Sequence, residues 1–179
     1  MNSLRSVIRI ATLCLFLVAI ALVTPITPAW AEFQTEQVNG QMLYKSWQTL
    51  YDIDRHSWKA IAFRQVGDLG ITPVYLRLIT FPGSATVDHG RSLTLLRPDA
   101  EPLLLADETA LISPNSPLYP NVAQYDLSLI LSQLDPTQPI RLSLPVVDGN
   151  PILLKVPPVA IQEWQAIATC ATMDCSLEN

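Results

Sequence analysis

Only two histidines, His56 and His89, offer acid–base chemistry near neutral pH in this chain. His89 directly follows Asp88, and a carboxylate beside an imidazole can hold one tautomer of the ring for proton transfer. Adjacent residues of a strand point to opposite faces, so Asp88 orients His89 only where a turn intervenes, which Gly90 permits. The pair is interpreted as a solvated turn that could take part in binding, with a hydrolase site around it as an alternative.

A second group of potential ligands is Asp52, Asp54 and His56, whose spacing could place three side chains on one side of a turn. A calcium loop of the helix–loop–helix kind needs further oxygen ligands and a glycine, which residues 55–58 do not supply. Acidic residues are also what a hairpin turn favours. The sequence therefore indicates a structural role for this group, and it predicts no metal and no cofactor.

Aromatic side chains are the other candidates for binding. Trp47 and Trp58 are expected to lie near each other across a hairpin, where a cross-strand aromatic contact stabilises a sheet. Trp47 and Tyr51 are predicted to belong to a binding surface. Together with Tyr44 and Asp52 they could instead form a weak carbohydrate-binding face.

The charge of the chain disfavours several classes of partner. Without residues 1–31 it has nine Lys and Arg against sixteen Asp and Glu, a formal charge of −7, and no cluster of basic residues. Nucleic acid and anionic lipid are therefore poor candidates. Arg77 is expected to form an ion pair with Asp88 or Asp126, a contact that is more often structural than functional. The chain has no zinc-protease, P-loop, dinucleotide-binding or serine-hydrolase motif.

Residues 1–31 have the pattern of a secretory signal peptide. Two arginines precede an uncharged apolar run, residues 10–23, and an A-x-A sequence ends at Ala31. Fourteen apolar residues at about 1.5 Å each fall short of the roughly 30 Å core of a bilayer, so no permanent membrane anchor is predicted after cleavage. The mature chain is expected to begin at Glu32, outside the cytoplasm.

After a loose polar leader over residues 32–40, residues 41–179 are predicted to form one domain of short strands. The strands are rich in aromatic and β-branched residues or alternate between apolar and polar positions, and turn-forming residues separate them. Asp148-Gly149 is the strongest of these turn signals. The predicted strands are residues 42–51, 58–66, 74–81, 93–96, 103–106, 140–144 and 152–156.

Two helices complete the prediction. Asp126 can cap a short helix near residues 127–134, and two prolines can open a C-terminal helix near residues 158–171. Apolar residues around Trp164 fall on one stripe of the second helix, which is expected to dock on a sheet. The predicted fold class is therefore mainly β, an antiparallel sandwich or partly closed barrel with these two helices.

Cys170 and Cys175 are the cysteines that remain after export, because Cys14 lies inside the signal. An oxidising compartment favours a disulfide between them, whereas C-x4-C alone lacks two ligands for a metal. Residues five apart in a continuous helix cannot bond, so the helix must end near Cys170 for the bridge to form.

Four stretches of the chain are distinctive as a set: LYKSWQTLYDIDRHSWKAIAFRQV, VYLRLITFPG with the following VDH, NVAQYDLS, and LSLP with VPPVAIQEWQ. Together they resemble a family of exported cyanobacterial proteins known as domain of unknown function 3122 (DUF3122). The resemblance covers roughly residues 41–165. It implies a cyanobacterial source, with the periplasm or the thylakoid lumen as destination, and it assigns no catalytic residue.

These observations favour a non-enzymatic exported protein that acts by binding a macromolecular partner, as a binding or assembly factor in the periplasm or thylakoid lumen. The inference comes from the class of protein and from the exclusions above. A carbohydrate- or cell-wall-binding module and a hydrolase that uses Asp88 and His89 are the alternatives.

Overall fold

Two long strands that alternate between inward and outward residues form the centre of the first sheet. In the computed structural model, which describes residues 34–38, 40–67 and 70–169, these are β2 (Gln41–Tyr51) and β3 (Ser57–Gly67). They pair antiparallel, with Leu50 opposite Trp58. The sheet has the order β1-β2-β3-β5-β8, with β4 added on β3. Its other strands are β1 (Gln34–Val38), β4 (Gly70–Ile71), β5 (Tyr75–Thr80) and β8 (Val122–Asp126).

The second sheet has four antiparallel strands in the order β10-β9-β6-β7. These are β6 (Leu93–Leu96), β7 (Leu103–Leu105), β9 (Ile140–Leu144) and β10 (Ile152–Val156). Along β9 the apolar residues are buried and Arg141 between them is exposed, as the alternation predicts. The hairpin from β9 to β10 passes through Gly149 at φ +99°, a backbone conformation that glycine adopts without strain.

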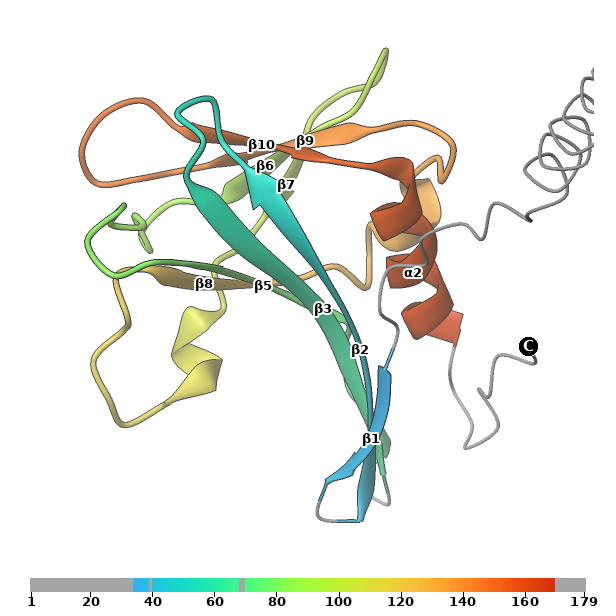
Figure 1. Ribbon diagram of the computed structural model, residues 1–179. Coiled ribbons are helices and arrows are strands. Elements are labelled where there is room, and N and C mark those ends of the chain that lie inside the picture. The colour runs from blue at the N-terminus through green and yellow to red at the C-terminus, as the bar shows by residue number, and fades with distance from the viewer. Residues whose placement is uncertain (1–33, 39, 68–69, 170–179) are drawn as a thin grey trace, which may run out of the picture. The chain divides into compact units, whose positions relative to one another are not determined.

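The inward faces of both sheets contribute to one core (Figure 1). Trp58 and Tyr44 enter it from the first sheet, and Leu95 and Leu142 from the second. The described strands form two sheets rather than a closed barrel, which confirms the predicted sandwich-like arrangement. At one edge an isolated bridge between Asp107 and Tyr125 of β8 joins the chain leaving β7 to the first sheet.

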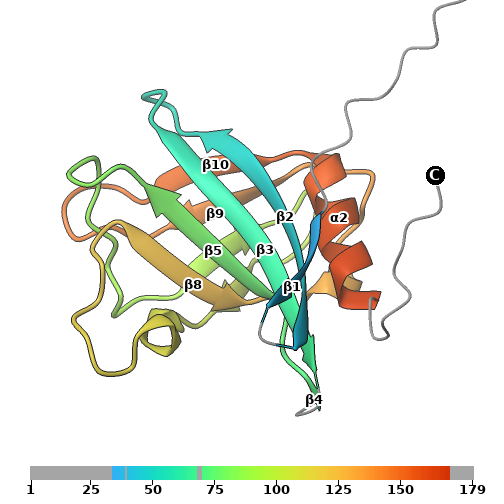
Figure 2. The same cartoon turned by 60° about the horizontal axis from the view of Figure 1, so that its bottom comes forward.

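Helix α2 (Pro158–Thr169) lies at the end where the two sheets diverge (Figures 1 and 2). It contacts β2, β3 and the 3-10 helix η2 (Leu131–Gln133), and it buries Trp164 as the apolar stripe predicts. The Arg64 guanidinium of β3 donates to the carbonyl oxygen of Ala168, which places a cation at the C-terminal end of α2. Among the described residues, no helix has the length and hydropathy that crossing a membrane requires.

Two local predictions need correction, and further elements were not predicted. The expected loose leader includes β1, whose backbone pairs with β2 because that strand otherwise presents an unpaired edge. The short helix near residues 127–134 is only the 3-10 turn η2, although Asp126 does accept the backbone N–H of Ser128 at 2.7 Å. Strand β8 and the 3-10 helix η1 (Thr109–Ile112) were not predicted, since alanine and glutamine weaken the β pattern of β8.

The expected contact between Trp47 and Trp58 is also wrong. Trp47 lies opposite Ile61, whereas Trp58 lies opposite Leu50. Because 47 and 50 differ by an odd number, the two indoles point to opposite faces of the sheet. Trp58 is fully buried in the core, and Trp47 is half-buried on the outside.

The predicted signal peptide with its cleavage site, the end of the predicted C-terminal helix at residues 170–171, and the Cys170–Cys175 pair lie outside the described residues.

Candidate functional site

The partner of His89 is Asp107, not the adjacent Asp88. Nδ1 of His89 lies 2.9 Å from Oδ2 of Asp107, and the two side chains are 17% and 7% exposed. The other carboxylate oxygen of Asp107 accepts the backbone N–H of Thr109 at 2.8 Å. His89 and Asp107 are 18 positions apart in the sequence, and an acid after a short strand carries no local signal of this pairing. Sequence reasoning therefore missed Asp107.

Both ring nitrogens of His89 face oxygen acceptors. Nε2 lies 3.3 Å from the carbonyl oxygen of Tyr119, and Nδ1 faces the carboxylate of Asp107. The Tyr119 carbonyl oxygen and an ionised Asp107 carboxylate only accept hydrogen bonds, so in each contact the ring nitrogen that faces the oxygen is the donor. A catalytic base needs a free nitrogen aimed at the proton it removes. Through these two contacts His89 instead connects the β5–β6 loop to Asp107, before η1, and to Tyr119, after it.

Asp88 serves the turn that the sequence predicted. Its Oδ1 accepts the backbone N–H of Gly90 at 3.0 Å, and its Oδ2 lies 4.0 Å from Nη1 of Arg91. The Arg91 side chain is 60% exposed and the Asp88 side chain 31% exposed, so this long ion pair contributes little to stability.

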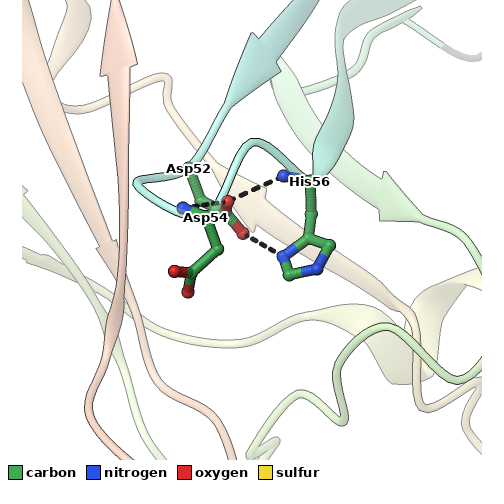
Figure 3. A group of neighbouring side chains, drawn as sticks. All are labelled: Asp52, Asp54 and His56. Atoms are coloured by element: carbon green, nitrogen blue, oxygen red, sulfur yellow. Dashed lines mark hydrogen bonds and ion pairs between the residues drawn. The ribbon is translucent and has the colours of Figure 1, made fainter.

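Asp52, Asp54 and His56 come together at the tip of the β2–β3 hairpin (Figure 3). One ligand atom from each lies within 4.8 Å of the others. Oδ1 of Asp52 accepts the backbone N–H groups of Asp54 and His56 at 2.9 and 2.8 Å, and its Oδ2 lies 3.1 Å from Nδ1 of His56. Burial raises the pKa of the Asp52 carboxyl, but the hydrogen bonds from His56 outweigh burial and hold that pKa below its usual value.

These hydrogen bonds explain the group as the closure of a hairpin. The atoms are of types that ligate cations, and a cavity of about 380 Å³ beside them is lined by further polar residues of the β5–β6 and β9–β10 connections. The carboxylate of Asp52 is nevertheless committed to the turn, and it already accepts three hydrogen bonds. The absence of a metal stays a prediction.

The outward side chains of β2, β3 and β5 form a surface of alternating cations and aromatic rings, which we term the outer face. Trp47 lies under two lysines, with Nζ of Lys45 and Lys59 at 5.9 and 5.3 Å from the ring centroid. Lys45 is paired with Glu36 of β1 at 2.6 Å. The residues of the outer face are Lys45, Trp47, Thr49, Lys59, Ile61, Phe63, Tyr75, Arg77 and Ile79.

Arg77 is the cation of β5 on this face, directly opposite Ile61 of β3. Its guanidinium carbon lies 4.9 Å from the ring centroid of Phe63, and Phe63 lies 5.8 Å from Tyr75. The predicted ion pair of Arg77 with an aspartate is wrong, because Nε and Nη2 donate to Oε1 of Gln124 at 3.2 and 2.6 Å. A neutral amide leaves the charge uncompensated, and burial lowers the pKa of Arg77.

The predicted binding residues therefore separate in space. Trp47 belongs to the outer face, and Tyr51, 60% exposed, ends β2 beside the hairpin tip. Tyr44, part of the carbohydrate-binding alternative, is fully buried in the core. At the far end of the outer face, a cavity of about 420 Å³ is lined by Lys59, Ile79, Phe81 and neighbouring residues.

This architecture defines an antiparallel two-sheet β protein with a C-terminal helix at one end and charged hairpin tips at the other. The chain belongs to the family described as protein of unknown function DUF3122, whose family model matches residues 31–167, as the four distinctive stretches predicted. No curated protein and no solved structure matches it.

Proposed function

We propose that this protein is an exported, non-enzymatic binding protein that recognises a partner protein through the outer face of its six-stranded sheet. The observation that carries the proposal is the composition of that face. Three cations, Lys45, Lys59 and Arg77, alternate with half-buried aromatic rings, in a chain whose overall charge is negative.

The chemistry of the partner follows from this composition. Lys59 and Arg77 have no carboxylate partner among the described residues, so an acidic group on another protein can pair with them. Phe81, 71% exposed, and the cavity beside it offer an apolar anchor at the edge of the same face. The partner is therefore a protein segment that presents acidic side chains next to an apolar one.

The two alternatives have weaker support. A sugar that stacked on Trp47 would have to displace the two ammonium groups already over its ring, and Tyr44 is buried out of reach. A hydrolase that used His89 would have to release Nε2 from the Tyr119 carbonyl. Export to the periplasm or thylakoid lumen of a cyanobacterium remains part of the proposal.

A photocrosslinking residue at Thr49, which is exposed on the outer face two positions after Trp47 and directly opposite Lys59, tests the proposal in native cells. We expect one adduct of defined mass, absent when the same residue is placed at exposed Leu104 on the other sheet. After the adduct is identified, purified partner should bind the Lys59→Glu variant at least tenfold more weakly. The matched charge reversal Arg91→Glu should change Kd less than twofold.

Binding should also weaken as salt rises, because exposed ion pairs are screened. Equal adducts from Thr49 and Leu104, an unchanged Kd for Lys59→Glu, or a hydrolytic activity abolished by His89→Ala would each overturn the proposal.

A further inference from the structure

The outward surface of the second sheet carries a cluster of positive charge that is independent of the outer face. Arg141 of β9 lies directly opposite Lys155 of β10, and both side chains are exposed. Like charges directly opposite each other destabilise a strand pair. The arrangement therefore costs stability, and neither side chain has an ion pair among the described residues to offset it.

Arg97 adds a third cation at the same place. Arg141 lies opposite Leu96 of β6, and Arg97 follows Leu96 directly. Nη1 and Nη2 of Arg97 donate to the backbone carbonyl oxygens of Gln133 and Glu101 at 3.3 and 2.7 Å, and its Nε is buried without a hydrogen-bond partner. Carbonyl oxygens hold the guanidinium in place but leave its charge uncompensated.

These three cations line one cavity of about 380 Å³, and no acidic residue lines it with them. That volume lies in the range of small-molecule sites, roughly 300–1,000 Å³. The rest of the wall is apolar and comes from Leu96, Pro98, Pro139 and Ile140. Three of the nine basic residues of the mature chain thus gather around an apolar hollow.

A second hollow of about 350 Å³ shares Arg141 and Lys155 with the first. Its apolar wall includes Tyr51, Ile53 and Leu153, which are 60%, 86% and 39% exposed. Its one acid, Asp52, is engaged in the hairpin turn described above. The cation pair therefore lines two hollows whose walls are otherwise mostly apolar.

We propose that Arg97, Arg141 and Lys155 form a binding site for an amphiphilic anion, a phosphate or carboxylate group joined to an apolar body. Guanidinium and ammonium groups recognise the anionic head, and the flanking hollows take the apolar part. The site lies on the other sheet from the outer face, so it does not depend on the proposed partner protein.

The test uses the mature protein with octyl phosphate below its micelle concentration, followed by isothermal titration calorimetry at fixed salt. Inorganic phosphate, which has only the anionic group, and octanol, which has only the apolar chain, are the two half-ligands. The Arg141→Gln/Lys155→Gln variant removes two cations and leaves the backbone-bonded Arg97 in place. Lys59→Gln/Arg91→Gln removes the same charge from two exposed positions that line neither hollow.

We expect octyl phosphate to bind at least tenfold more tightly than either half-ligand. The Arg141→Gln/Lys155→Gln variant should lose at least tenfold in affinity, and the control variant less than twofold. Without ligand, the site variant should also melt at an equal or higher temperature, because it relieves the Arg141–Lys155 repulsion. That result excludes unfolding as the cause of lost binding.

Vesicles distinguish a free amphiphile from a membrane headgroup. Binding to phosphatidylglycerol vesicles but not to phosphatidylcholine vesicles, lost in the site variant, identifies the headgroup of an anionic lipid as the source. Binding of octyl phosphate alone identifies a free ligand. Octanol or inorganic phosphate binding as tightly as octyl phosphate, unchanged affinity in the site variant, or no binding by octyl phosphate and by either vesicle would overturn the proposal.

Discussion

Replacing Asp107 by alanine should destabilise the protein far more than replacing Asp88, although Asp88 is the sequence neighbour of His89. Asp107→Ala leaves two donors without their acceptor, Nδ1 of His89 and the backbone N–H of Thr109. An unsatisfied buried donor costs about 1–3 kcal/mol. The His89 ring is 17% exposed and can recruit water, which reduces its share, so the expected loss is about 2–4 kcal/mol.

Asp88→Ala removes much less. The Asp88 side chain is 31% exposed, and its ionic partner Arg91 is 60% exposed at 4.0 Å. Such a pair contributes about 0–1 kcal/mol, and the exposed N–H of Gly90 can bond water instead. We therefore expect a loss of under about 1 kcal/mol.

Urea unfolding of the mature chain, followed by tryptophan fluorescence, measures both losses. A domain of this size has about 5–15 kcal/mol of stability, so each variant should remain folded without denaturant. A double-mutant cycle with His89→Ala should give a coupling between His89 and Asp107 of about 1.5–3 kcal/mol, as for a hydrogen bond to a charged group. Equal losses for Asp88→Ala and Asp107→Ala, or a coupling near zero, would refute the reasoning.

Three further variants and one mass measurement test other parts of the structure. Asp52→Ala should lower the unfolding free energy by about 1–3 kcal/mol at pH 7. Because the pKa of Asp52 is lowered by folding, the difference should shrink as the pH falls below 3.8; a loss equal at pH 7 and pH 2.5 would contradict this. Burial raises the pKa of the Glu163 carboxyl more than a hydrogen bond from Gln48 lowers it, so this pKa lies above 4.5. The charged form of Glu163 therefore destabilises the fold once the pH exceeds 4.5. Glu163→Gln should therefore raise the Tm at pH 7 but not at pH 4, and a gain confined to acid pH would contradict the sign. The Trp164 side chain is only 1% exposed, so Trp164→Ala leaves a cavity and should lower the unfolding free energy by about 3–5 kcal/mol in the same urea assay. A loss below about 1 kcal/mol would place the helix outside the core. Mass spectrometry of the native protein should find an N-terminus at Glu32, and an intact Met1 would contradict the predicted export signal.

Elements whose pattern is local could be predicted from the sequence. The alternation of Ile140, Leu142 and Leu144 with polar residues identified β9, because a strand repeats every two residues whatever it packs against. The apolar stripe around Trp164 identified the docking face of α2 for the same kind of reason. The four distinctive stretches indicated the family, which the match over residues 31–167 confirms.

Contacts between distant segments were decided only by the tertiary structure. The register of β2 against β3 put Trp47 and Trp58 on opposite faces, and a shift of one residue would have put both on the same face. His89 and Asp107 meet because the chain leaving β7 bridges to β8, a path that no local pattern encodes.

The charges of the protein show the same difference between what the sequence determines and what the tertiary structure decides. Composition correctly described a chain with an excess of acids and no basic run. It could not show that Arg97, Arg141 and Lys155 gather around one cavity, because β6, β9 and β10 become neighbours only when the sheet forms. Net charge is a sum over residues and is known from the sequence by itself, whereas a binding site depends on where the fold places each charge.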